Sequence, residues 1–116
     1  MLQRDSDSLR DMLISARPVA RCVSGRTFDE FVDDIQFQDS VIRRIEIIGE
    51  AARRVSEEVR NSLPNLPWGR MAGMRNLPIH GYDGIDLYLT WDTATSDVAS
   101  LIELLERLLE REDPAP

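Results

Sequence analysis

The chain has 116 residues, of which 42% are apolar, and its formal net charge is −7. This length and apolar content predict a single domain with its own core and exclude a disordered chain. Cys22 is the only cysteine, which excludes an intrachain disulfide scaffold and a cysteine-rich zinc site. Because no apolar run exceeds three residues, a membrane span and a signal-peptide core are excluded as well. We therefore expect a cytoplasmic protein.

The negative charge is unevenly distributed. Residues 27–42 contain five acidic residues and no basic one, whereas residues 43–75 contain seven arginines and four acidic residues. All fourteen basic residues are arginines, and a guanidinium can bind a phosphate or a carboxylate through two parallel hydrogen bonds. The net charge argues against a nucleic-acid partner, but the basic middle of the chain leaves that function open.

Apolar residues recur at helical spacing through the first sixty residues. A first helix is predicted, with Ser6 or Ser8 as its N-cap and Gly25 at its end. Thr27 and Glu30 have the spacing of a capping box, which predicts a short acidic helix. The strongest stripe predicts one long helix over about residues 36–61. Its members are Val41, Ile45, Ile48, Ala52, Val55 and Val59.

Two further helices are predicted in the second half. Pro67 suits the first turn of a helix that reaches Arg75. Pro78 removes an amide donor, so we expect an irregularity over residues 77–80. Asp86 can cap a last helix. The apolar stripe of that helix is Leu87, Trp91, Ala94, Val98, Leu101, Leu105 and Leu108.

These elements define the expected architecture. Short connections between successive helices favour antiparallel neighbours. We predict an all-α fold, an antiparallel up-and-down bundle of four main helices plus a short helix. Residues 1–112 are expected to form one helical domain, and residues 113–116 a frayed tail.

The sole histidine, His80, lies close to other polar residues: Arg75 and Asn76 precede it, and Tyr82 follows. Histidine is the usual general acid or base near neutral pH. Metal-free RNA cleavage needs a base, an acid and fixed positive charge, which Arg75 can supply. One chain offers a single histidine, so a symmetric homodimer would provide the missing group. The alternative is a structural or exposed His80, with Arg75 paired to a nearby aspartate.

The run Arg75-Asn76-x3-His80-x-Tyr82 resembles the Arg-x4-His-x-Tyr signature of HepT-like toxins, which belong to the HEPN superfamily of small helical proteins. The resemblance covers about residues 6–110 and implies a metal-independent endoribonuclease that acts as a homodimer. Other segments that resemble the family, in the expected order, are residues 8–13, 39–52, 67–68, 73–76 and 84–91.

The resemblance also implies a role for each motif residue. Arg75 would contact the scissile phosphate, His80 would be the acid–base group, and Asn76 would orient or assist. The partner of such toxins is a minimal nucleotidyltransferase antitoxin, which transfers AMP from ATP to the motif tyrosine, here Tyr82. The added bulk and negative charge beside Arg75 would exclude an RNA phosphate.

Other arginines are candidates for RNA contact. Arg44 has no acidic residue three or four positions away, which makes it the better candidate, and Arg70 is a weaker one. Arg53 and Arg54 have glutamates four positions away, which is typical of a solvated helix face. We expect core packing for Trp68, Trp91 and Cys22.

No metal or cofactor is expected, because Asp83 and Asp86 with one histidine form no recognised ligand spacing. An alternative to the enzyme is a non-catalytic helical binding subunit that docks a nucleotidyltransferase. The net charge of −7 favours this alternative, since it weakens attraction to RNA. A third possibility is a bundle whose motif only seals the dimer.

Overall fold

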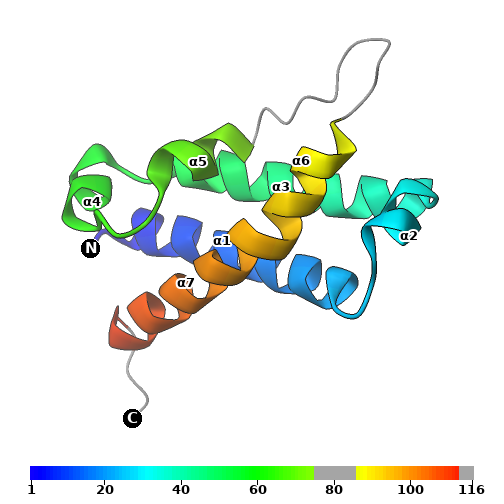
Figure 1. Cartoon of the computed structure of the whole chain (residues 1–116). Coiled ribbons are helices and arrows are strands. Elements are labelled where there is room, and N and C mark those ends of the chain that lie inside the picture. The colour runs from blue at the N-terminus through cyan, green and yellow to red at the C-terminus, as the bar shows by residue number, and fades with distance from the viewer. Residues whose placement is uncertain (75–85, 113–116) are drawn as a thin grey trace.

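The computed structural model describes residues 1–74 and 86–112 (Figure 1). The described part contains helices and no strand, and it forms the all-α, HEPN-like bundle that the sequence predicts. Its elements are α1 (Gln3–Val23), α2 (Phe28–Val32), α3 (Ile35–Arg54), α4 (Glu57–Ser62), α5 (Trp68–Gly73), α6 (Leu87–Asp92), the π-helical segment η2 (Thr93–Asp97) and α7 (Val98–Glu112).

Helix α1 is central to the core, because it packs against both α3 and α7 (Figure 1). Helix α5 packs against α3, and α2 contacts α3 and α6. Each fully buried leucine or isoleucine side chain stabilises the fold by about 1.5–3 kcal/mol relative to an exposed one. The large side chains that are fully buried on α1, α3 and α7 include Leu9, Met12, Ile45, Ile48, Leu101 and Leu105.

Helix α1 begins earlier than the sequence predicts. The carbonyl of Leu2 accepts the amides of Asp5 and Ser6, so the first turn precedes both predicted caps. Ser6 and Ser8 lie inside the helix and are buried, and the prediction that one of them is the N-cap is wrong. The predicted end is confirmed: α1 stops at Val23, and Gly25 follows with a φ of 74°, a conformation that favours glycine.

The capping box before α2 is confirmed. The Thr27 hydroxyl accepts the Glu30 amide at 3.1 Å, and the Glu30 carboxylate accepts the Thr27 amide at 2.9 Å. The Glu30 carboxylate accepts hydrogen bonds from the Thr27 amide and, at 3.2 Å, from the Thr27 hydroxyl, and these two bonds, that from the amide above all, lower the pKa of the Glu30 carboxyl. The box orients α2 so that Phe31 is fully buried, with its ring centroid 5.1 Å from Phe37 and 5.2 Å from Trp91.

The prediction of one uninterrupted helix over residues 36–61 is wrong. Helix α3 ends at Arg54, Val55 and Ser56 are extended, and α4 begins at Glu57. The Ser56 hydroxyl accepts the Val59 amide at 3.3 Å and so caps α4. The break arises from a distant residue. The buried carboxylate of Asp5 accepts hydrogen bonds from the amide and the hydroxyl of Ser56, at 2.8 and 2.9 Å.

The predicted cap of the last helix is confirmed, since the Asp86 carboxylate accepts the Leu89 amide at 2.9 Å. The sequence does not predict the π-helical segment η2 that separates α6 from α7. Near the end of α7, Leu109 is buried and Leu108 is half-buried against the core, so the stripe includes both.

Several further expectations can be compared with the structure. Cys22 is exposed on the last turn of α1, so the expectation of a buried cysteine is wrong. Trp68 and Trp91 are half-buried and pack against the core, as expected. The predicted irregularity over residues 77–80 and the predicted frayed tail at 113–116 lie outside the described residues. None of the described helices is both long and apolar enough to cross a membrane.

Candidate functional site

The predicted catalytic residues Arg75, Asn76 and His80 and the predicted AMP acceptor Tyr82 lie outside the described residues. The structure describes the chain on either side of this motif. On one side, Met74 is only 3% exposed and belongs to the core. On the other side, Asp86 is the N-cap of α6. The motif is therefore bounded by a core residue and by a capped helix start.

Helix α5, which precedes the motif, is attached to the bundle at several points. Met71 is fully buried, and the Trp68 indole N–H donates to the Leu63 carbonyl at 3.0 Å. Met71 and Met74 are three residues apart and share the face that packs on the core. This attachment fixes the position from which the chain enters the motif.

Arg70, one of the two candidate RNA contacts, lies on the exposed side of α5. Its guanidinium donates to the Asp97 carboxylate at 2.8 Å, and the Asp97 side chain is only 17% exposed. This ion pair connects α5 to η2. The structure thus places Arg70 in an ion pair, and an RNA phosphate would compete with Asp97 for the same guanidinium.

Arg44, the stronger candidate, is exposed on α3. Among the side chains that the structure describes, those of residues 1–74 and 86–110, no carboxylate forms an ion pair with it. Its charge is thus available to a ligand. This placement agrees with the absence of acidic neighbours in the sequence.

The remaining arginines differ in how far their charge is already compensated. Arg53 and Arg54 are exposed, as expected for a solvated face. Arg54 pairs with Asp11 of α1 at 3.4 Å. The sequence pattern suggested only partners four positions away, so it did not predict this pair between two helices. Arg26 pairs with Glu30 and Asp34. Several basic side chains are therefore neutralised in the fold, which limits how far the surface attracts RNA.

Asp97 is the residue near the site that sequence reasoning missed. It lies 27 positions after Arg70, and no periodicity or motif relates the two.

The described residues contain no group of three or more histidine, cysteine, aspartate or glutamate side chains placed to hold a metal ion.

Comparison with known proteins decides the family. The model of the family described as "Ribonuclease HepT-like" matches residues 12–108 of the chain. The chain belongs to the HepT-like ribonuclease family. The matched span contains the Arg75–His80 motif and the helices on both sides of it. Membership in a ribonuclease family makes the chain an enzyme of that class.

Several relatives of this HepT-like chain are known. A protein of Methanocaldococcus jannaschii named "Putative RNase MJ1380" is 38% identical over 107 residues, which cover 91% of this chain and 98% of that protein. A protein of Thermococcus cleftensis named "Probable ribonuclease HepT" is 33% identical over 108 residues, or 93% of this chain and 98% of the relative. No solved structure matches the chain.

Proposed function

We propose that this HepT-like protein is a metal-independent endoribonuclease toxin that acts as a homodimer. Arg75 contacts the scissile phosphate, His80 transfers the proton, and Asn76 orients or assists. One observation carries the proposal: the family match extends over residues 12–108, and the Arg-x4-His-x-Tyr motif is intact within it.

The chemistry follows from what RNA cleavage requires without a metal. A base takes the proton of the 2′-hydroxyl, whose oxygen attacks the phosphorus, and an acid protonates the departing 5′-oxygen. Arg75 stabilises the negative charge of the phosphorane. Each chain has one histidine, so the second proton-transfer group comes from the motif of the other subunit, across a two-fold axis.

Arg44 and Arg70 are proposed to guide the RNA backbone. Arg44 is exposed and has no ion-pair partner among the residues that the structure describes. Arg70 is 67% exposed at its side chain and is adjacent in sequence to the buried Met71. It must leave Asp97 to contact a phosphate, so Arg44 has the larger role.

The proposed regulator is a minimal nucleotidyltransferase antitoxin that transfers AMP to Tyr82. The phenolic oxygen attacks the α-phosphorus of ATP, and pyrophosphate leaves. The tyrosine lies two residues after His80. The attached nucleotide adds bulk and negative charge beside Arg75, which excludes an RNA phosphate.

Cleavage is tested with the protein expressed without its partner. Wild type is expected to cleave RNA in EDTA and to inhibit growth, whereas His80→Ala does neither. Glu58→Gln, at an exposed position of α4, is the matched control and keeps both activities. Equal cleavage by wild type and His80→Ala would exclude the catalytic role. A strictly monomeric protein in light scattering at micromolar concentration would exclude the shared site.

Regulation is tested by mass spectrometry after incubation with the antitoxin and ATP. The chain has only two tyrosines, Tyr82 and Tyr88, and the side chain of Tyr88 is exposed. Tyr88→Phe is therefore the natural control for Tyr82→Phe. We expect AMP on wild type and on Tyr88→Phe, and none on Tyr82→Phe. AMP on Tyr88 would contradict the proposal.

The alternative function is a non-catalytic subunit that only docks a nucleotidyltransferase. The net charge of −7 favours it, as do the ion pairs that neutralise arginines of the described residues. Both features weaken non-specific attraction to RNA. The two functions differ in the His80→Ala experiment, because a docking subunit shows no histidine-dependent cleavage and still binds its partner.

A further inference from the structure

A small pocket of about 250 Å³ lies between α4 and the first turn of α5. It is lined by Glu57, Arg60 and Asn61 of α4 and by Trp68, the first residue of α5. We call it the Arg60–Trp68 pocket. Pockets for drug-sized ligands measure about 300–1,000 Å³, so this one has room for one flat group rather than for a long ligand. Its lining combines a cation, a carboxylate, an amide and an aromatic ring.

The guanidinium of Arg60 lacks a partner. Its Nε atom is buried, and no hydrogen-bond acceptor within the described part of the chain reaches it. None of the carboxylates that the structure describes forms an ion pair with it. A buried donor without an acceptor is unfavourable, and more so when it is charged. An anionic oxygen of a ligand would supply the missing acceptor once the side chain turns toward the opening.

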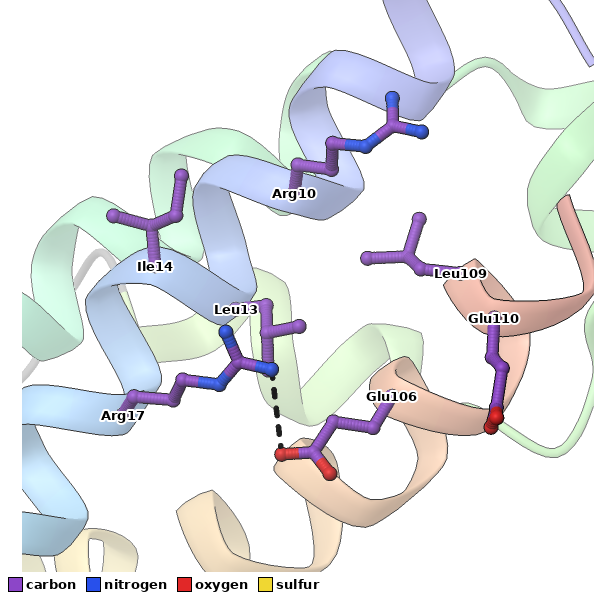
Figure 2. A pocket seen from close by; sticks show the side chains of 7 residues that line it. All are labelled: Arg10, Leu13, Ile14, Arg17, Glu106, Leu109 and Glu110. Atoms are coloured by element: carbon purple, nitrogen blue, oxygen red, sulfur yellow. Dashed lines mark ion pairs between the residues drawn. The ribbon is translucent and has the colours of Figure 1, made fainter. Parts of the chain in front are cut away.

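The arginines of another pocket provide a contrast. A pocket of about 530 Å³ lies between α1 and α7 (Figure 2). Arg17 lies 3.5 Å from Glu106 of the facing helix, and Arg10 lies 3.9 Å from Asp7 of its own helix. Both cations of that pocket are therefore compensated within the chain. Arg60 has no counterpart of these pairs among the described side chains.

Trp68 contributes aromatic surface to the pocket, and its polar atom is already satisfied. The indole N–H donates to the Leu63 carbonyl at 3.0 Å, which fixes the ring. The side chain is half-buried against the core, and it lines the pocket with what remains accessible. Unpaired bases of a single strand stack on aromatic rings of this kind. A flat base is therefore the group that fits beside Trp68.

Glu57 makes the pocket selective. The residue is exposed, and it forms no ion pair with Arg60 or with any other side chain that the structure describes. Arg53 lies four residues earlier, but the break between α3 and α4 separates the two. An ionised carboxylate only accepts hydrogen bonds, and its two oxygens can accept two parallel N–H donors. Guanine is the RNA base that carries two adjacent N–H donors on its pairing edge, which single strands expose.

We propose that the Arg60–Trp68 pocket binds one unpaired guanine nucleotide of the RNA substrate. The base stacks on Trp68, its pairing edge donates to Glu57, and an adjoining phosphate accepts from Arg60. Asn61 lines the same pocket, and its amide can donate to the carbonyl oxygen of guanine. An acidic peptide would bring no base edge and would meet Glu57 with like charge. The inference rests on the proposed ribonuclease function, because it names a base that the substrate presents.

The pocket lies close to the point where the chain enters the motif. Trp68 begins α5, and Met74 is its C-cap. At a rise of 1.5 Å per residue, the two residues are about 9 Å apart along the helix. All residues of the pocket precede the motif and belong to the described part of the chain. The pocket thus reads a base beside the proposed cleavage site, not at it.

Binding of short RNA to the His80→Ala protein tests the base preference. Labelled oligouridines with guanine, adenine, cytosine or uracil at the central position are titrated, and fluorescence anisotropy gives the Kd. The guanine oligonucleotide should bind at least about fivefold more tightly than the others, which is the discrimination of one good two-bond contact. Glu57→Gln should remove this preference. Glu58→Gln is the matched control and should keep it, because the exposed Glu58 lines a different pocket, beside Met1 and Leu2.

Arg60→Gln tests the phosphate contact. It should weaken the binding of all four oligonucleotides and reduce the slope of log K against log salt concentration by about 0.7, since one phosphate contact is lost. Arg21→Gln, at an exposed position in the last turn of α1, should leave the slope unchanged.

Trp68 gives a second measurement that alters no residue of the pocket. The chain has two tryptophans, so in Trp91→Phe the intrinsic fluorescence comes from Trp68 alone. Stacking of a base should quench this fluorescence, and the guanine oligonucleotide should do so at the lowest concentration. Unchanged fluorescence at concentrations that saturate the anisotropy would overturn the inference even if the α4 variants fail to fold.

The outcomes separate this inference from the proposed function. Binding without a base preference, or binding that Glu57→Gln and Arg60→Gln leave unchanged, would overturn the pocket and leave His80-dependent cleavage standing. Guanine-dependent binding together with equal cleavage by wild type and His80→Ala would overturn the mechanism and support the pocket. Tighter binding of free GMP than of the guanine oligonucleotide would overturn RNA as the ligand.

Discussion

The carboxylate of Asp5, in the first turns of α1, holds the amide and the hydroxyl of Ser56, 51 residues later, at 2.8 and 2.9 Å. In a continuous helix the Ser56 amide would donate to the carbonyl four residues earlier. Asp5 takes that donor instead, while the Ser56 hydroxyl caps α4. One buried carboxylate thus ends α3, begins α4 and attaches both to α1.

This contact predicts a pH-dependent contribution to stability. Hydrogen bonds from Ser56, led by that of its backbone amide, hold the pKa of Asp5 below its ordinary value. A carboxyl with a lower pKa in the folded state contributes its full stability above the unfolded-state pKa, and this contribution is lost as the pH falls through the folded-state pKa. We expect Asp5→Asn to lower the melting temperature at pH 7, and the difference from wild type to shrink below about pH 4.

The measurement is thermal unfolding followed by circular dichroism from pH 7 to pH 3. Asp39→Asn, at an exposed position of α3, is the control and should melt like wild type throughout. A constant difference between wild type and Asp5→Asn over the whole range would show that the ionised form of Asp5 is not what matters.

Two helix starts are predicted correctly from local signals in the sequence, whereas the cap expected at Ser6 or Ser8 is not found. The Thr27–Glu30 capping box and the Asp86 cap each involve residues three positions apart, so the amino-acid pattern alone reveals them. The break at Ser56 is different, because its cause is Asp5, a residue of another helix. The apolar stripe continues across the break and gives no sign of it.

The candidate site divides along the same line. The absence of acidic neighbours around Arg44 is a local property, and the structure agrees with it. The pairing of Arg70 with Asp97 depends on how α5 packs against η2, and no local pattern encodes it. The roles of Arg75 and His80 derive from the motif and the family, and they remain predictions.

Phe31 attaches the short helix α2 to the bundle. It is fully buried and meets the rings of Phe37 and Trp91. Truncating a buried phenylalanine removes transfer free energy and leaves a cavity, so Phe31→Ala should cost about 3–5 kcal/mol in the free energy of unfolding. Urea denaturation measures the cost. Val32→Ala, at the exposed neighbouring position, should change stability by less than about 0.5 kcal/mol. Equal effects of the two substitutions would contradict this account of α2.

The capping box before α2 predicts a smaller effect. Thr27→Ala removes the acceptor of the Glu30 amide and should cost about 1 kcal/mol. Ser40→Ala, at an exposed position inside α3, removes a hydroxyl without removing a cap and is the matched control. Urea denaturation of both variants checks the prediction, which is wrong if Ser40→Ala is equally destabilising.

Removing a charge near the proposed RNA path should have opposite effects on RNA binding at Arg44 and at Asp97, the partner of Arg70. Binding is measured on the His80→Ala background, so that the RNA stays intact. Arg44→Ala should weaken binding and reduce the slope of log K against log salt concentration by about 0.7, because one phosphate contact is lost. The slope should not change for Arg21→Ala, an exposed arginine at the end of α1.

Asp97→Asn weakens the pairing of Arg70 at 2.8 Å and should strengthen RNA binding, since the guanidinium becomes available to a phosphate. If Asp97→Asn leaves affinity unchanged while Arg44→Ala lowers it, Arg70 serves only to hold α5 against η2, and Arg44 is the guiding cation.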